Sequence, residues 1–299
     1  MSEFRFCVNP SGRELAQCSA VLNGRIGKRD YIVNDYRTTL SIKSVSRGYA
    51  IYRTRAGRFR VDADNLLVLN HGQEYSLEIP AGTQTETLCP FFQPGLIEHV
   101  AGSRQKTSQQ QLDDIDAAAG SIEFCERLYL KEGGLAACLS AIASGLKSPA
   151  RSGPWLEDRF FRLAEELVRL HDTVRNEISD FPGCRPSTRE ELYRRLHRAR
   201  DWIDSSYADA VTVSQAARVA CMSPYHFQRM FRLAFRQTPM QFLQERRLRA
   251  ARRLLSGTDR DITSICLDVG FESLGSFSWL FRRRFGASPR DFRRRQRAF

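Results

Sequence analysis

The stretch MSPYHFQRMFRLAFRQTP at residues 222–239 returns 50 residues later, in degenerate form, as ESLGSFSWLFRRRFGASP at residues 272–289. The residues shared by the two copies are Ser223 and Ser273, Phe227 and Phe277, Phe231 and Phe281, Arg232 and Arg282, Phe235 and Phe285, and Pro239 and Pro289. Phenylalanines spaced four apart lie on one face of a helix. A serine before the first of them is a good N-cap, and a proline after the last marks a stop. Each copy therefore predicts a capped helix with an aromatic face.

A shorter helix is predicted in front of each aromatic helix. Residues 213–219 are rich in small side chains, which let this helix approach its neighbour closely, and a tight turn at Cys221 follows. In the second copy, Gly270 is the turn glycine. This is the layout of a helix-turn-helix unit, whose second helix is placed to enter the major groove of DNA. We expect the two units at about residues 205–236 and 257–286.

The helical period assigns an outward face to each aromatic helix. With the first phenylalanine as the direction of the core, and ~100° per residue, polar residues of the first copy point away from the core. Side chains near the start of a recognition helix reach base edges, and later arginines meet phosphate. The expected DNA contacts of the first unit are Ser223, Tyr225, His226, Gln228, Arg229 and Arg232, with Tyr225, His226, Gln228 and Arg229 at base edges.

The second unit offers fewer hydrogen-bonding groups on the equivalent face. Its expected contact residues are Ser273, Leu274, Gly275, Ser276, Ser278, Trp279, Arg282 and Arg283. The two arginines are candidate phosphate anchors. We expect this unit to read sequence weakly, through apolar contact and DNA shape.

Positive charge is concentrated in the same part of the chain. The protein has 299 residues and a formal net charge of +12. Residues 190–299 hold 22 Arg, no Lys and 11 acidic residues, whereas residues 1–189 carry a net charge of only +1. The planar fork of arginine suits phosphates and base edges. The asymmetry favours a polyanionic partner, although an arginine-rich helical bundle without one would have the same composition.

A strong helix is predicted between the copies, at residues 240–255, and would hold the recognition helices about one DNA turn apart, roughly 34 Å. From about residue 195 to 295 the sequence resembles the DNA-binding domain of the AraC/XylS family of bacterial transcription regulators. The matching strings include MSPYHFQRMF, RRLRAARRLL and RRRFGASP. The resemblance implies a seven-helix domain docked in successive major grooves of promoter DNA, with RNA polymerase as a further partner.

Three residues depart from the usual pattern of that family. The family places a small residue where Cys266 stands, a basic residue where Trp279 stands and a polar residue where Leu274 stands. These departures bear on base reading by the second unit and leave the fold unaffected.

The N-terminal part has the pattern of β structure between about residues 30 and 100. Short segments rich in Val, Ile, Leu and Tyr, separated by turn residues, predict a small barrel or sandwich. These segments are Leu40–Val45, Tyr49–Arg53, Leu66–Leu69 and Tyr75–Ile79. The family resemblance implies a cupin-like barrel that binds a small effector, and residues 66–75 are similar to a segment of such a barrel. We therefore expect an α+β protein, with an N-terminal cupin-like β-barrel plus helices and a C-terminal all-α domain with two helix-turn-helix units.

A barrel interior is a usual place for a small ligand. Four aromatic residues could line such a pocket or form the core, and we prefer the core: Tyr49, Tyr52, Phe59 and Tyr75.

Helices are predicted after the β region, at Ile122–Leu130, Leu135–Leu146 and about Trp155–Ile178. In the last of these, apolar residues alternate by four and three, as in a heptad seam. They are Leu156, Phe160, Leu163, Leu167, Leu170 and Val174. The seam either forms a homodimer or packs on its own domain. Residues 181–189 have the composition of a linker, which divides the chain into domains at 1–180 and 190–299.

No catalytic or metal-binding pattern stands out. The eight cysteines include no C-x-x-C pair, the five histidines form no cluster in the β region, and phosphate-loop and nucleophile motifs are absent. A redox role for a cysteine is left open. The first residues contain no apolar core of signal-peptide length, and no apolar run has the length needed to span a bilayer. We expect no cofactor, no metal, no enzymatic activity and no membrane partner, and a cytoplasmic, nucleoid-associated protein of a bacterium.

These patterns favour a sequence-specific transcription regulator, with activation preferred over repression, that dimerises and responds to a small molecule or a partner. The alternative is a non-specific architectural protein that coats nucleic acid through its arginine-rich half. The mixture of tyrosine, histidine and glutamine on the first recognition helix argues against that alternative, because phosphate coating needs no such groups.

Overall fold

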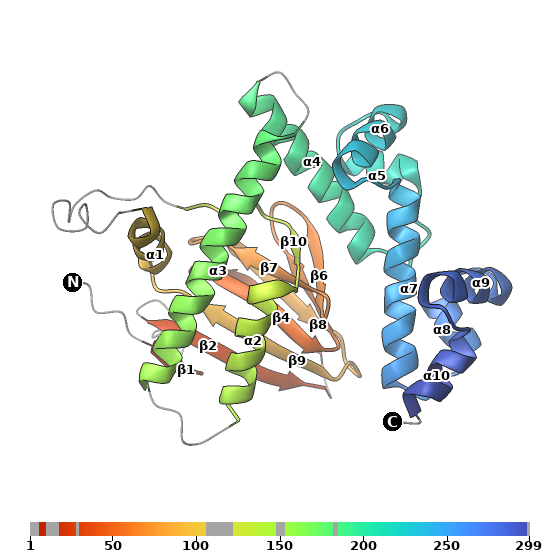
Figure 1. Cartoon of the computed structure of the whole chain (residues 1–299), viewed down its shortest axis with the longest axis horizontal. Helices are drawn as coiled ribbons and strands as arrows, with labels where there is room; N and C mark the ends of the chain where they lie inside the picture. The colour runs from red at the N-terminus through yellow and green to blue at the C-terminus, as the bar shows by residue number, and fades with distance from the viewer. Residues whose placement is uncertain are drawn as a thin grey trace. The chain divides into compact units, whose positions relative to one another are not determined.

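The structure, a computed structural model, describes residues 6–9, 18–27, 30–105, 122–147, 153–181 and 185–297. The chain divides into two compact units, Met1–Glu190 and Glu191–Phe299 (Figure 1). Helix α4 (Pro186–Ser205) begins inside the range 181–189 in which the sequence predicts a linker. Of that range, residues 182–184 lie outside the described residues.

The N-terminal unit is built on two β-sheets. Its strands are β1 (Phe6–Val8), β2 (Ser19–Ile26), β3 (Tyr31–Arg37), β4 (Ser41–Arg47), β5 (Tyr49–Arg53), β6 (Arg58–Asp62), β7 (Asn65–Leu69), β8 (Glu74–Ile79), β9 (Thr85–Phe91) and β10 (Leu128–Leu130). One sheet has the order β1-β2-β9-β4-β7-β10, and the other has the order β3-β8-β5-β6. The α+β class is confirmed, but in the described residues the sheets remain two separate hydrogen-bonded layers. The expected closed barrel is therefore corrected to an open two-sheet arrangement.

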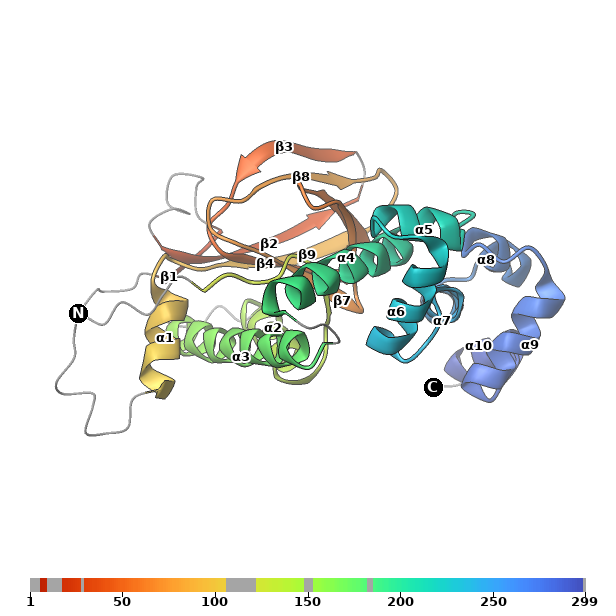
Figure 2. The ribbon, with the colours of Figure 1, turned by 90° about the horizontal axis from the view of Figure 1, so that it is seen from above.

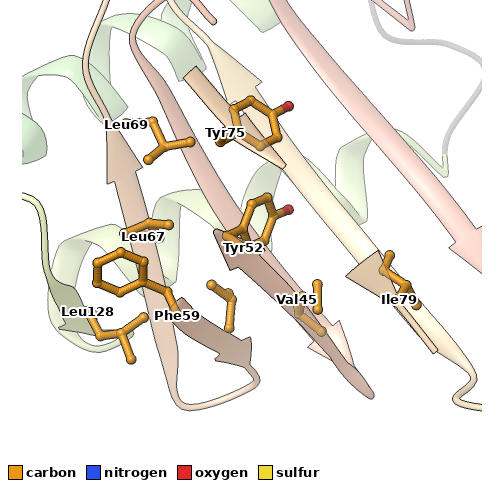
Figure 3. Close-up of a cluster of buried hydrophobic side chains, with 10 residues drawn as sticks. Val45, Tyr52, Phe59, Leu67, Leu69, Tyr75, Ile79 and Leu128 are labelled. Atoms are coloured by element: carbon orange, nitrogen blue, oxygen red, sulfur yellow. The ribbon is translucent and has the colours of Figure 1, made fainter. Parts of the chain in front are cut away.

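The core of this unit lies between the two sheets. Figure 3 shows Tyr52, Phe59 and Tyr75 of the four-stranded sheet with Leu67 and Leu69 of the six-stranded sheet in one buried cluster. All five residues of β7 are buried, as expected for a strand covered on both faces. Three of the four aromatic residues considered as pocket lining are thus core, and Tyr49 is half-buried.

Three helices complete the unit: α1 (Leu96–Gln105), α2 (Gly133–Gly145) and α3 (Gly153–Ser179). Figure 2 shows α2 and α3 against the six-stranded sheet, on the side away from β3 and β8. The helix expected at Ile122–Leu130 is wrong, since residues 122–127 are irregular and Leu128–Leu130 pairs with β7 as strand β10. The apolar residues of this segment are spaced in a way that suits either a helix or a strand. The pairing with β7, which is distant in the sequence, makes Leu128–Leu130 a strand.

The apolar seam of α3 is used within its own domain. Leu156, Phe160, Leu163, Leu167 and Val174 are buried, and Leu170 is half-buried. The ring of Phe160 packs edge-on against Phe92 at 5.5 Å. These six side chains are therefore not a free dimer surface, and the heptad pattern reflects packing on the β-sheet domain.

Cys7 and Cys18 are joined by a disulfide, which the spacing of the cysteines does not predict. Their sequence separation of 11 residues matches no C-x-x-C motif, so only the alignment of β1 beside β2 brings them together.

The C-terminal unit is helical. Its described residues form α4, α5 (Val213–Val219), α6 (Pro224–Phe235), α7 (Pro239–Gly257), α8 (Ile262–Asp268), α9 (Leu274–Phe285) and α10 (Pro289–Arg297). The seven helices agree with the number implied by the family resemblance. In Figure 1, α5 and α6 lie beside one end of α7, and α8, α9 and α10 lie beside the other. The predicted connecting helix at residues 240–255 is confirmed as the central part of α7.

The repeat in the sequence is a repeat in three dimensions. In α6, the Phe231 ring lies 5.4 Å from Phe227 and 4.5 Å from Phe235. In α9, the Phe281 ring lies 5.7 Å from its equivalent neighbour on one side and 4.6 Å on the other. Each aromatic row then meets a phenylalanine of the following helix, Phe242 or Phe292. The Phe spacing therefore builds the same small core twice.

Candidate nucleic-acid interface

Helix α6 presents a polar face because its aromatic face is buried. The Ser223 hydroxyl accepts the His226 amide hydrogen bond at 3.4 Å, and Pro224 occupies the first helical position. With Phe227 and Phe231 fully buried, the side chains on the other faces point outward. Tyr225 is 80% exposed. The other predicted contact residues of this unit are also exposed: Ser223, His226, Gln228, Arg229 and Arg232.

A cavity of about 500 Å³ lies on this face. It is lined by Tyr225, Gln228, Arg229, Arg232, Leu233, Arg236 and Thr238. Four of the six residues predicted to contact DNA from the first unit therefore come together in one concave, basic site. Leu233 and Thr238 were not predicted, and Arg236, which the helical period places on the outward face, was not included among the expected DNA contacts.

Helix α9 has the same architecture and a different surface. The Ser273 hydroxyl accepts the Ser276 amide hydrogen bond at 3.2 Å. Leu274 and Trp279 are 42% and 61% exposed, and the Arg283 guanidinium lies 5.3 Å from the Trp279 ring. Of the remaining predicted residues, Gly275, Ser276, Arg282 and Arg283 are exposed and Ser278 is half-buried. The face is thus apolar at its centre and basic toward its end.

Arg284 is held away from that face by an ion pair. Its guanidinium lies 2.7 Å from a carboxylate oxygen of Glu245 on α7, and this contact raises the pKa of Arg284 above its ordinary value. The ion pair leaves Arg284 less well placed to reach phosphate than Arg282 and Arg283.

A buried ion pair fixes α7 against α4. The Arg246 guanidinium lies 2.8 Å from an Asp204 carboxylate oxygen, and Arg246 is only 1% exposed. The guanidinium also lies over the Tyr207 ring at 4.5 Å. Nearby, Arg247 donates to the Tyr207 carbonyl at 2.7 Å. The five arginines of α7 were counted only as positive charge in the sequence, yet two of them hold the scaffold together.

One buried lysine marks the core of the N-terminal unit. The Lys43 amine lies 3.3 Å from the Tyr75 hydroxyl and 4.1 Å from the centre of the Phe91 ring. Burial lowers the pKa of this amine to about 8, and burial likewise raises the pKa of Tyr75. The sequence offered no signal for this group, because a lysine inside a short β-strand is indistinguishable from one on its surface.

Across the described ranges, no three histidine, cysteine, aspartate or glutamate side chains gather closely enough to hold a metal ion. None of the helices in the described part of the chain combines the length and apolar character needed to cross a bilayer.

Two helix-turn-helix units on a common long helix, preceded by a two-sheet domain, define a protein of the double helix-turn-helix class. A helix-turn-helix domain family matches residues 216–295. The transcriptional activator RhaS of Yersinia pestis is 30% identical over 130 residues, which are 43% of this chain and 48% of RhaS. The chain thus aligns with about half the length of that relative. The regulatory protein SoxS of Salmonella typhimurium is 36% identical over 95 residues, which are 32% of this chain and 89% of SoxS.

Among solved structures, the DNA-binding domain of AdpA in complex with a target DNA is 31% identical, with a TM-score of 0.34 over 35% of this chain and 94% of that one. The match to SoxS spans nearly the whole of that relative. The chain belongs to the AraC/XylS family of transcription regulators.

Proposed function

We propose that the protein is a sequence-specific DNA-binding regulator that activates transcription from bacterial promoters. The observation that carries this proposal is the outward face of α6, where exposed Tyr225, Gln228 and Arg229 line one basic cavity. Arginine and glutamine are the side chains best suited to paired hydrogen bonds with guanine and adenine in the major groove. A protein that only coats phosphate needs positive charge and no such mixture.

The two units have different tasks in this proposal. The first reads base edges through Tyr225, His226, Gln228 and Arg229, with Ser223 and Arg232 near the backbone. The second contacts DNA through an apolar centre at Leu274 and Trp279, flanked by the small residues Gly275, Ser276 and Ser278. Its Ser273, Arg282 and Arg283 lie toward phosphate.

Helix α7 supports simultaneous binding by both units. Its 19 residues span about 28 Å at ~1.5 Å per residue. This length is comparable to one turn of DNA, roughly 34 Å. Two recognition helices on one rigid helix of this length suit successive major grooves on one side of the duplex.

We assign sensing and dimerisation to the N-terminal unit. A small molecule or a partner protein would bind there and favour the DNA-competent arrangement of a homodimer. Because a ligand of equal affinity for both arrangements shifts nothing, the effector must bind that arrangement more tightly. RNA polymerase is the partner that activation requires, and the relative RhaS is named a transcriptional activator.

A binding selection tests this function. The full-length protein is mixed with random duplex DNA at ~0.15 M salt, and the bound fraction is sequenced. We expect two short preferred blocks about one helical turn apart, roughly 10 bp. An unpatterned pool from folded protein, with and without candidate effectors, would contradict sequence-specific reading and favour the architectural alternative.

A further inference from the structure

Arg236 adopts a backbone conformation that the equivalent position of the second unit gives to glycine. Arg236 ends α6 with φ of 56° and ψ of 17°, in the left-handed region. Gly286 ends α9 at the same place, with φ of 75°. Glycine is the usual residue at this helix end, because a Cβ atom makes the left-handed conformation unfavourable. An arginine there carries a conformational cost that the second unit avoids.

The side chain of Arg236 lies where its charge can act. It lines the cavity on the outward face of α6, together with Arg229 and Arg232. All three arginines are exposed, and among the residues that the structure describes no carboxylate forms an ion pair with any of them. Arg284 of the second unit, by contrast, is paired with Glu245. The first unit therefore keeps a cluster of uncompensated guanidinium groups beside the residues proposed to read bases.

The second unit has no equivalent cluster. Fifty residues on, Trp279 stands for Arg229 and Gly286 stands for Arg236, and only Arg282 repeats an arginine of the cavity. The arginine cluster is thus specific to the first unit. The high arginine content of the C-terminal unit as a whole does not explain it. Strained backbone conformations are often found where the strained residue supplies a functional group to a binding site.

We infer that Arg236, together with Arg232, binds a backbone phosphate of the duplex at the C-terminal end of α6. The forked N–H donors of arginine match phosphate oxygens in geometry and charge. Tyr225, Gln228 and Arg229 remain toward the base edges, because they lie on the earlier turns of the helix. This inference rests on the proposed DNA binding, and it adds to that site a residue that fixes the position of the first unit on the duplex.

The test combines binding and stability of the full-length protein. Binding is measured by fluorescence anisotropy on the selected duplex and on a scrambled duplex, between ~50 and ~200 mM salt. The variants are Arg236→Gly, which removes both the charge and the strain, and Arg236→Lys, which keeps the charge. Arg198→Gln is the matched control, because it removes one exposed charge from α4, outside both recognition helices.

For Arg236→Gly we expect weaker binding to both duplexes by the same factor, and a salt slope that is shallower by about 0.9. Its melting temperature should equal or exceed that of the wild type, since glycine tolerates the left-handed conformation. Arg236→Lys and Arg198→Gln should keep the wild-type slope. A stabilised protein with weaker binding would separate the role in binding from any role in folding.

Other results would overturn the inference. If the wild type prefers the selected duplex and Arg236→Gly has the wild-type salt slope, the phosphate contact is contradicted. The proposed function would still stand in that case. A loss confined to the selected duplex would make Arg236 a base-reading residue, and a lower melting temperature would make it a structural one. Wild-type protein that binds both duplexes equally would overturn the proposed function, whereas a shallower slope for Arg236→Gly would still support the phosphate contact.

Discussion

The two helix-turn-helix units share their interior and differ at their surface. In both, a serine caps the aromatic helix and three phenylalanines in tilted ring contact form the core. On the outward face, the first unit has Arg229 where the second has Trp279, and Arg236 where the second has Gly286. The repeated Ser, Phe and Pro residues therefore determine the scaffold, and the residues that differ between the copies determine how the contacts of the two units differ.

Two ion pairs that tie neighbouring helices to α7 also differ in burial. A buried ion pair between Arg246 and Asp204 ties α7 to α4, near the first unit. The second unit has an ion pair between Arg284 and Glu245, whose arginine side chain is half exposed. Breaking a buried ion pair lowers the free energy of unfolding much more than breaking an exposed one. The pair between Arg246 and Asp204 should thus be the more costly of the two to break.

The largest expected effect concerns this attachment. Asp204→Ala should lower the free energy of unfolding of the C-terminal unit by about 3–5 kcal/mol, because it leaves the Arg246 charge buried without its partner. Glu245→Ala is the matched control and should cost at most ~1 kcal/mol, as exposed pairs do. Urea unfolding of the full-length variants measures both values. Equal losses would contradict the difference in attachment.

The next effect concerns base reading. Arg229→Ala should weaken binding to the preferred sequence by ~1–3 kcal/mol and relax specificity at one position of the first block. Trp279→Ala changes the equivalent residue of the second unit and should relax specificity less. Repeating the selection with each variant supplies the measurement. Equal weakening by Arg229→Ala on every DNA sequence would sink its assignment to a base edge.

A smaller effect tests what the units have in common. Ser223→Ala and Ser273→Ala should each cost about 1 kcal/mol of stability, since each hydroxyl caps its helix through one amide hydrogen bond. The two losses should be similar, because each hydroxyl accepts a hydrogen bond from the amide three residues further on. Thermal melting of both variants provides the comparison, and a large inequality would show that the shared scaffold is not energetically equivalent.

The smallest expected effect lies in the salt dependence of the second unit. Arg283→Ala should weaken binding uniformly across DNA sequences and make the salt slope shallower by about 0.9. The exposed guanidinium near the Trp279 ring is free of ion pairs among the described carboxylates, so it can reach phosphate. Titrations on two unrelated duplexes measure the slope. A change on only one duplex would reassign Arg283 to base contact.

The helical half of the molecule was predictable because its signals are local. The Ser, Phe and Pro spacing specifies caps, faces and ends within 18 residues, and α6, α7 and α9 follow it closely. The exposure of Tyr225 and Trp279 follows from the same period. What the pattern could not show is the cost at Arg236, since a backbone angle at a helix end depends on how the next helix packs.

The β-sheet half was predicted less well because its structure depends on distant pairing. Leu128–Leu130 becomes a strand only by lying beside β7, more than 50 residues earlier in the chain. The open arrangement of two sheets, instead of a barrel, depends on which strands pair at the sheet edges. Likewise, the seam of α3 has the spacing of a dimer helix, and only its burial against Phe92 and its neighbours shows that it is occupied.

The most direct test of the central claim is a substitution panel over the selected DNA site. Each base pair is changed in turn, and the dissociation constant of the full-length protein is measured at ~0.15 M salt. If α6 reads base edges and α9 makes mainly apolar and phosphate contacts, changes in the first block should cost ~1–3 kcal/mol each. Changes in the second block should then cost clearly less. Equal costs in the two blocks, or larger costs in the second, would contradict the account.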